Sequence, residues 1–183
     1  MTFDIALYGS GISSKIAAIA LAKHDYSVCL ISDQIGDYQN KTPSNLVTFL
    51  SNGSLSYLQT ILSEIKFFEQ FDDIKKISCQ LEGLKKSKDE FIHFNEKKEH
   101  ILGKIITNSE FDNFLNFELE RNQKIDFIKG HKIIKIENNN NFTNISLDNK
   151  NSLSANLFIF SSSIDEKIVN ELSIKFINKD FYQ

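Results

Sequence analysis

Near the start of the chain, apolar residues fall into three blocks that predict a strand, a helix and a second strand. Residues 3–8 and 27–31 are short and almost continuously apolar, and residues 12–23 between them are rich in alanine and isoleucine. The two short runs lack the alternation of a half-exposed strand, so we expect each to be buried on both faces of a parallel sheet. Parallel neighbours require a crossover connection, and the helical block between the runs supplies it.

Farther along the chain, the spacing of apolar residues predicts more helices and strands. Apolar residues three and four positions apart predict a helix over residues 44–66, and Ser109 with Asp112 resembles a capping box that opens another helix. A short helix is predicted at 165–172. The asparagine-rich segment 137–141 favours a hairpin, because asparagine tolerates left-handed backbone. Strands are predicted at residues 75–84, 90–95, 101–106, 125–128, 133–136, 142–147 and 157–160.

The turn between the first strand and the first helix has glycines at the spacing of a dinucleotide-binding turn. It reads Gly9-x-Gly11-x-x-Ser14, with serine at the position of the third glycine. The first glycine permits a sharp bend, and the second allows backbone to approach a pyrophosphate at the helix N-terminus. The second strand ends at Ser32 and Asp33, where a carboxylate would accept hydrogen bonds from a ribose. The alternative interpretation is a tight turn that binds nothing.

Together these elements predict an α/β fold of the Rossmann-like, GxGxxG type, with a parallel sheet, a β-hairpin or meander and a small inserted strand lobe over residues 70–106. The helix over residues 12–23 should cover one face of the parallel sheet. At 183 residues, the chain is expected to be one nucleotide-binding-like domain that includes the lobe. The parallel sheet is expected to contain the four buried runs at residues 3–8, 27–31, 125–128 and 157–160.

Charge and cysteine content limit the partners and the compartment. A net charge of −3 gives no electrostatic case for a nucleic acid partner. No apolar run reaches the length of a membrane-spanning helix, and the N-terminus lacks the basic region of a secretion signal. The two cysteines, Cys29 and Cys79, fit a reducing compartment, and Cys29 is most simply a core residue. We therefore expect a cytoplasmic protein, with peripheral contact at a membrane surface left open.

Other chemically active residue types do not form a recognisable site. The four histidines lack the spacing of metal ligands. No nucleophile elbow surrounds Ser161–Ser163, so a polar loop after a buried strand is the better interpretation. Phe67, Phe68 and Phe71 are expected in a core or an interface rather than in a quinone-like pocket. We therefore predict no metal site and name no catalytic residue.

Four segments, in order along the chain, resemble the FAD-dependent aromatic hydroxylases, and specifically the monooxygenases of ubiquinone biosynthesis. The first is the strand–helix–strand unit with Gly9 and Gly11. The second, residues 50–58, is similar to the family's Leu-Ser-x-x-Ser-x-x-x-Leu helix, and the third, residues 102–108, is similar to its Leu-Gly-x-x-Val-Glu-Asn. The fourth comprises residues 155–160, 172–174 and 180–183. The resemblance covers only the N-terminal half of a family protein.

This resemblance implies an FAD cofactor and monooxygenase chemistry, an oxidoreductase activity. The adenosine end of FAD is expected at Gly9, Gly11 and the strand end Ser32–Asp33, and the backbone near Ile133 is expected to approach the adenine. The implied substrate is an aromatic or polyprenyl-phenol compound.

Several positions near the expected cofactor depart from the family's pattern. Ser14 replaces the third glycine, Ser32 stands where the second strand should end in glutamate, and Thr107 replaces a glutamate of the third segment. Leu46 stands near the place of a family arginine, and Ser161–Ser163 replace an Ala-Asp-Gly segment. The apolar framework is kept while polar contacts to the cofactor change, so FAD is expected to bind weakly or not at all.

Two functions fit this pattern. The first is the N-terminal FAD-binding part of a flavin-dependent monooxygenase, which would be catalytically incomplete by itself. The alternative is a truncated, cofactor-poor relative that serves as a non-catalytic binding or scaffold protein. With half of the family fold missing, apolar surface would be left bare, so we expect self-association or a protein partner.

Overall fold

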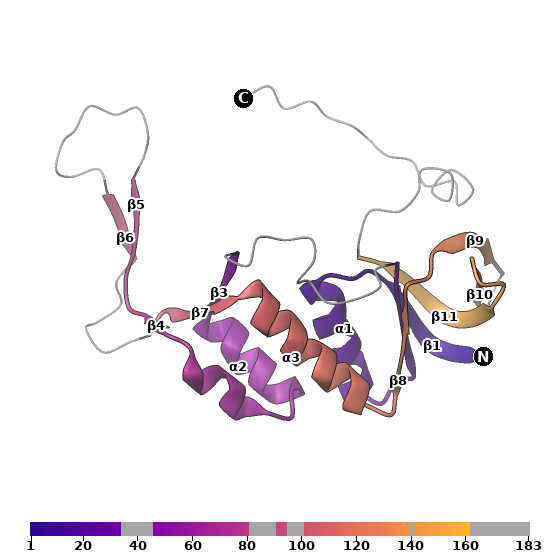
Figure 1. Ribbon diagram of the computed structural model, residues 1–183, viewed down its shortest axis with the longest axis horizontal. Helices are drawn as coiled ribbons and strands as arrows, with labels where there is room; N and C mark the ends of the chain where they lie inside the picture. The colour runs from indigo at the N-terminus through magenta and orange to yellow at the C-terminus, as the bar shows by residue number, and fades with distance from the viewer. Residues whose placement is uncertain (34–45, 81–90, 95–100, 140, 162–183) are drawn as a thin grey trace, which may run out of the picture. The chain divides into compact units, whose positions relative to one another are not determined.

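The computed structural model describes residues 1–33, 46–80, 91–94, 101–139 and 141–161. The chain divides into two compact units (Figure 1). The first comprises Met1–Asp37 with Asp112–Gln183, and the second comprises Tyr38–Phe111.

A six-stranded sheet in the order β8-β2-β1-β11-β10-β9 forms the centre of the first unit (Figure 1). Strands β8, β2, β1 and β11 are parallel neighbours, and β10 pairs antiparallel with both β11 and β9. The structure therefore confirms the predicted parallel sheet and the predicted hairpin. The strands are β1 (Thr2–Tyr8), β2 (Val28–Ser32), β8 (Ile125–Lys129), β9 (Ile133–Asn138), β10 (Thr143–Leu147) and β11 (Ser152–Phe160).

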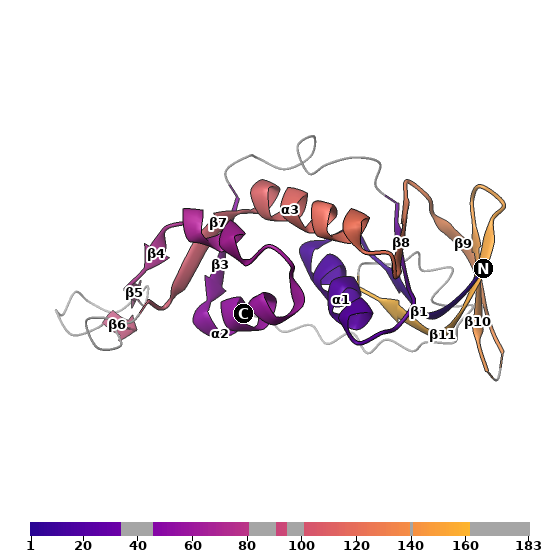
Figure 2. The ribbon, with the colours of Figure 1, turned by 90° about the horizontal axis from the view of Figure 1, so that it is seen from below.

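The two faces of this sheet are covered by different elements. Helix α1 (Ile12–Lys23) contacts β1, β2 and β8. Successive side chains of a strand point to opposite faces, and alternate residues of β1 and β2 form a core cluster with residues of β9, β10 and β11. Figure 2 shows α1 and the β9–β10 hairpin on opposite sides of β1. The members contributed by β1 and β2 are Ala6, Tyr8, Cys29 and Ile31.

Helix α3 (Asn108–Arg121) begins with a side-chain cap from Thr107 and not with the predicted capping box. The Thr107 hydroxyl accepts a hydrogen bond from the backbone N–H of Glu110 at 3.3 Å and donates one to the Glu110 carboxylate. The predicted pair, Ser109 and Asp112, is therefore wrong by two residues. The helix starts earlier because Thr107 satisfies the same requirement for a polar cap.

Asp112 instead forms a buried ion pair with Lys15 of α1. The Lys15 Nζ lies 2.6 Å from the Asp112 Oδ1, and the two side chains are 5% and 2% exposed. The pair joins α3 to α1 next to the glycine turn. Each charge is costly to bury alone, so the contact fixes the two helices to one another.

Helices and two small antiparallel sheets form the second unit. Helix α2 (Asn52–Ile61) is followed by a 3-10 helix, η2 (Ile65–Gln70). Phe68 is buried, and its ring packs edge-on against Phe67 and Phe111, with centroids 5.3 Å and 6.1 Å away. The sheets are β3-β7-β4, formed by β3 (Val47–Ser51), β7 (Gly103–Thr107) and β4 (Asp73–Ile74), and β5-β6, formed by β5 (Ile77–Gln80) and β6 (Phe91–Phe94).

The predicted helix over residues 44–66 is wrong in its first part. Residues 47–51 form β3, which pairs antiparallel with β7. Helix α2 begins only at Asn52, where the hydroxyl of Ser51 accepts a hydrogen bond from the N–H of Ser54 at 3.2 Å. Apolar spacing is misleading here because pairing with a distant strand decides the conformation of this segment.

Some expectations fall on other parts of the chain. The predicted helix at 165–172 lies outside the described residues, as do parts of the strands predicted at 75–84 and 90–95. Within the described ranges, no helix combines the length and the apolar character needed to cross a membrane.

Substituting Lys15 tests the buried ion pair. Lys15→Met should lower the free energy of unfolding by about 3–5 kcal/mol, because it leaves the Asp112 carboxylate buried without its cation. Lys15→Met/Asp112→Leu should recover most of that loss, since apolar replacement of both partners removes the desolvation cost. Urea unfolding followed by circular dichroism measures both variants.

The exposed pair Lys135–Glu137, 2.7 Å apart, provides the control. Lys135→Met should change stability by less than about 1 kcal/mol. A loss in Lys15→Met no larger than in this control would contradict the structural role of the buried pair.

Candidate nucleotide-binding site

The four parallel strands end at one edge of the sheet, and the residues that follow them are small or polar. Gly9 follows β1, Asp33 follows β2, Gly130 follows β8 and Ser161 follows β11. Open α/β sheets bind ligands at this carboxyl-terminal edge. The structure therefore brings the predicted turn and the predicted end of the second strand to the same edge.

Backbone hydrogen bonds connect these strand ends. The N–H of Gly9 donates to the carbonyl of Ile31 in β2 at 2.9 Å, and the N–H of Ser161 donates to the carbonyl of Tyr8 in β1 at 3.0 Å. The turn after β1 is thus fixed on both sides by its neighbouring strands.

A side chain at Gly9 would not fit. A Cβ built there would lie 2.5 Å from the hydroxyl oxygen of Ser14 and would also overlap the hydroxyl oxygen of Ser161. The backbone φ of +158° is one that residues with side chains rarely adopt. Glycine at this position is therefore required by the fold, whether or not a ligand binds.

Gly11 differs, because neither its backbone angles nor any of the described residues require a glycine there. Its φ of −79° and ψ of 166° suit any residue, and a Cβ built there would have no described atom within 4 Å. Gly11 is the N-cap of α1, and no side chain caps this helix end. The open space beside the first N–H groups of a helix is where an anionic group would be held. The residues present therefore fit a pyrophosphate.

Ser14, at the position of the third glycine, lies beneath this turn. It is buried, and its hydroxyl oxygen is 2.5 Å from that of Ser161. The predicted polar loop after β11 therefore begins with a residue that contacts the glycine turn directly.

One carboxylate, that of Asp33, follows the end of β2 at the carboxyl-terminal edge of the sheet. Ser32 is buried, and its carbonyl accepts hydrogen bonds from the N–H groups of Gly130 at 2.7 Å and His131 at 3.1 Å. Asp33 is exposed. The pKa of the Tyr8 phenol is raised, mainly by burial and also by the negative charge of Asp33. Asp33 rather than Ser32 is thus the residue that could accept hydrogen bonds from a ribose.

Ile133 begins β9, and its side chain is buried in the core cluster. Its backbone pairs with Leu147 of β10. Only backbone atoms of Ile133 are available to a ligand, so the predicted approach to adenine stays a prediction about the backbone.

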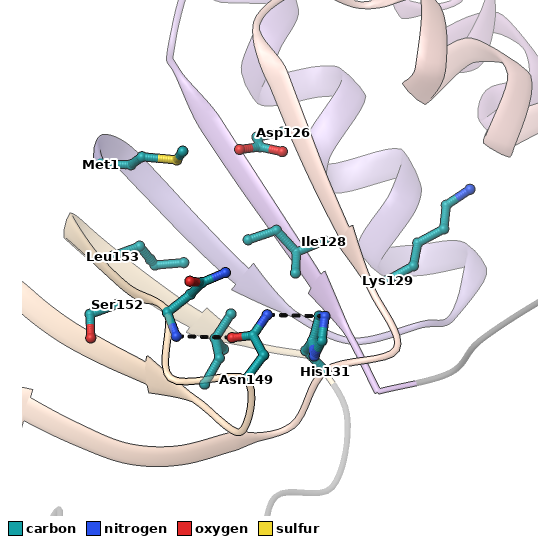
Figure 3. A pocket seen from close by; sticks show the side chains of 10 residues that line it. Met1, Asp126, Ile128, Lys129, His131, Asn149, Ser152 and Leu153 are labelled. Carbon is teal, nitrogen blue, oxygen red and sulfur yellow. Dashed lines mark hydrogen bonds between the residues drawn. The ribbon is translucent and has the colours of Figure 1, made fainter.

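A separate pocket of about 460 Å³ lies between β8 and the turn that joins β10 to β11 (Figure 3). The His131 Nδ1 lies 2.9 Å from the Asp148 Oδ1, and the Asn149 Nδ2 lies 3.1 Å from the His131 Nε2. The hydrogen bond from His131 lowers the pKa of Asp148. These contacts hold the turn against the chain that leaves β8. Neither Gly9 nor Gly11 lines this pocket.

Neither a metal site nor a reactive thiol at Cys29 is found among the described residues. They contain no group of three or more His, Cys, Asp or Glu side chains that could hold a metal ion. Burial raises the pKa of the Cys29 thiol to about 12, which keeps it protonated and unreactive at neutral pH.

Sequence reasoning missed two polar contacts next to the turn. The Lys15–Asp112 pair could have been inferred from the sequence, because both charged residues stand at otherwise apolar positions. Lys15 interrupts an alanine-rich helix, and Asp112 shares a helical face with Leu115 and Leu119. The contact of Ser14 with Ser161 could not have been inferred from the sequence, because it depends on the parallel pairing of β1 with β11.

Several solved structures share this fold. PqsL, a probable FAD-dependent monooxygenase from Pseudomonas aeruginosa, aligns with 99% of this chain and 48% of its own, at a TM-score of 0.72 and 10% identity. The p-nitrophenol 4-monooxygenase PnpA from Pseudomonas putida DLL-E4 aligns with 88% of this chain and 41% of its own, at a TM-score of 0.68 and 11% identity. A geranylgeranyl bacteriochlorophyll reductase-like protein from Thermoplasma acidophilum aligns with 95% and 42%, at a TM-score of 0.67 and 15% identity.

At such identities the likeness shows the fold, which is that of the N-terminal, FAD-binding part of flavin monooxygenases. The chain spans less than half the length of each of these proteins. No family model and no curated protein matches the sequence.

The two glycines should respond differently to the same substitution. Gly9→Ala should destabilise the protein by about 2 kcal/mol or more, because the added methyl overlaps two hydroxyl groups at an unfavourable φ. Gly11→Ala should cost less than about 1 kcal/mol, the loss expected when alanine replaces a good N-cap residue. Thermal and urea unfolding measure the difference. Equal losses would mean that Gly11 is also required by the fold.

Proposed function

We propose that this chain is the FAD-binding part of a flavin-dependent monooxygenase. The proposal rests on Gly11, a glycine at the N-terminus of α1 that neither its backbone angles nor any described neighbour requires. A pyrophosphate needs this combination, because its oxygens approach the backbone too closely for a side chain. The parallel strand ends around the turn and the fold shared with flavin monooxygenases support the same ligand.

Each part of the edge would hold a different part of the cofactor. The N–H groups at the start of α1 would donate hydrogen bonds to the pyrophosphate, and Asp33 would accept hydrogen bonds from the adenosine ribose. The backbone near Ile133 would lie against the adenine. When bound, FAD supplies the oxygen chemistry of such enzymes. The chain's own contribution is binding and orientation, and we assign no catalytic side chain.

We propose weak FAD binding, because one expected contact at the ribose is altered. Ser32 is neutral and buried where the family has a glutamate, which leaves Asp33 one residue later. A hydrogen bond to a charged group contributes about 1.5–3 kcal/mol, so its weakening alone would lower affinity more than about tenfold.

The proposed substrate is an aromatic compound of the polyprenyl-phenol type. Residues 50–58 and 102–108 support the ubiquinone-biosynthesis type through their resemblance to that family's motifs. Two proteins with this fold support an aromatic compound more generally: PnpA is a p-nitrophenol 4-monooxygenase, and PqsL has been solved in complex with 2-aminobenzoylacetate. The proposed location is the cytoplasm, with peripheral membrane contact where a polyprenyl substrate resides.

Titration with FAD tests the proposed function. The protein should bind FAD with a dissociation constant in the micromolar range or weaker, and Gly11→Val should lower the affinity at least about tenfold by blocking the approach of the pyrophosphate. Gly53→Val is the matched control, because Gly53 also lies near a helix N-terminus and a Cβ there would have its nearest neighbour 3.9 Å away. Flavin fluorescence measures the affinities, and circular dichroism verifies folding. Equal affinity in Gly11→Val, or no binding by the wild type, would refute the proposal.

One observation favours the alternative, a non-catalytic binding or scaffold protein. Phe49 and Ile105 are opposite neighbours on β3 and β7, and they are 42% and 37% exposed. Val47, on the same face of β3, is 54% exposed. An exposed apolar sheet face of this kind usually marks an interface. The face would serve a protein partner or a second copy whether or not FAD binds.

Sedimentation over a concentration series tests self-association through this face. The wild type should associate, and Phe49→Lys/Ile105→Lys should shift it toward monomer. Ile134→Lys is the control, because Ile134 is 56% exposed on β9, outside this sheet face. A wild type that stays monomeric throughout the series would contradict self-association, and with cooperative unfolding it would mean that the shortened fold is self-sufficient.

A further inference from the structure

Three groups form a directed hydrogen-bond chain across the glycine turn. The hydroxyl of Ser161 donates to the carbonyl oxygen of Tyr8 at 3.1 Å. A serine hydroxyl has one proton, so the contact of 2.5 Å between the Ser14 and Ser161 oxygens requires Ser14 to be the donor. The chain therefore runs from α1 through the residue after β11 to the end of β1.

The two serines depend on this contact to different degrees. Ser14 is 1% exposed, and in the part of the chain that the structure describes its hydroxyl has Ser161 as its only hydrogen-bond partner. Ser161 is exposed and keeps its bond to Tyr8 in any case. Removing Ser161 would thus leave a buried donor unsatisfied, whereas removing Ser14 would not.

Gly9 makes room for both hydroxyls. The space that a Cβ on Gly9 would take is the space in which Ser14 and Ser161 meet. A dinucleotide-binding turn normally has a third glycine where this chain has Ser14, so that helix and strand can pack closely. Here the serine is accommodated because its hydroxyl is directed toward Ser161.

We propose that Ser14 and Ser161 act as one unit that takes the place of the third glycine and positions the first turn of α1 for its ligand. This inference rests on the proposed nucleotide site at Gly11. Both serines are positioning residues, since they act through the backbone of the turn and not by contact with the ligand.

The physical basis is the behaviour of a serine hydroxyl that loses its partner near a helix start. Such a hydroxyl bonds to a nearby backbone carbonyl and bends the helix. Three residues before Ser14, at one of the positions this pattern uses, is the carbonyl of Gly11, which already accepts the N–H of Lys15 at 3.2 Å. Competition for this carbonyl would distort the turn in which the ligand's anion would be held.

The test is a double-substitution cycle with ADP as the probe, because ADP has the pyrophosphate but not the flavin. Ser161→Ala should lower ADP affinity about five- to tenfold, because the freed Ser14 hydroxyl would compete for the Gly11 carbonyl and distort the turn that holds the anion. Ser14→Gly/Ser161→Ala should return to within about twofold of the wild type, because it removes the unsatisfied hydroxyl and restores a glycine. Ser56→Ala, an exposed serine on α2 outside the proposed site, should leave the affinity unchanged.

Calorimetric titration and urea unfolding are measured on the same variants. An unchanged affinity in Ser161→Ala, or a double variant as weak as the single one, would overturn the inference even if the wild type binds ADP and FAD. If the wild type binds ADP but not FAD, the proposed flavin function fails. The positioning role of the two serines is then still decided by the ADP affinities of the single and double variants. If the wild type binds neither ADP nor FAD, the proposed function and the positioning role both fail. A double variant that is more stable than Ser161→Ala would then show only that the Ser14–Ser161 hydrogen bond stabilises the fold.

Discussion

Burial of β1 and β2 on both faces is the constraint on which the rest of the first unit depends. Val28, Cys29, Leu30 and Ile31 are fully buried, so each face of β2 must be covered by another element. Helix α1 covers one face, and on the other face residues of β1 and β2 share a core cluster with side chains of β9, β10 and β11. Parallel pairing then places the ends of β8, β2, β1 and β11 at one edge, where Gly9, Asp33 and Ser161 each follow a strand and Gly9 lies against Ser161. The candidate site is thus a consequence of how the core is closed.

At that edge, one glycine of the turn is required by the packing of the protein and the other is suited to a ligand. Gly9 is required by its neighbours, since Ser14 and Ser161 fill the space where its side chain would be. Gly11, at the start of α1, has no such requirement among the described residues, since a Cβ built there would have no described atom within 4 Å. Buried polar contacts below the turn, Lys15 with Asp112 and Ser14 with Ser161, support its shape from within the protein. The contact of Ser14 with Ser161 explains how a serine is accommodated in the turn.

The pattern of apolar residues along the chain was sufficient to predict the strands that are buried on both faces. The runs at 3–8, 27–31, 125–128 and 157–160 predicted the parallel sheet, because strands buried on two faces need unbroken apolar sequence. The strand β3 was missed because it depends on pairing with β7, far along the chain. The glycine turn was predicted from its spacing, but the partner of Ser14 was not, since nothing in the sequence near Ser14 specifies which strand end will lie above it. Long-range pairing, rather than residue type, limits what the sequence reveals here.

The most direct test of the central claim, that the open backbone at Gly11 holds an anionic nucleotide, is to observe those amides. Two-dimensional 15N–1H NMR spectra of the protein would be recorded while ADP is added. If this backbone holds the anion, the amide signals of Gly11, Ile12 and Ser13 should shift progressively and saturably, while those at the start of α2, such as Ser54, stay in place. Saturable shifts confined to other residues, or no shifts at the start of α1, would contradict it.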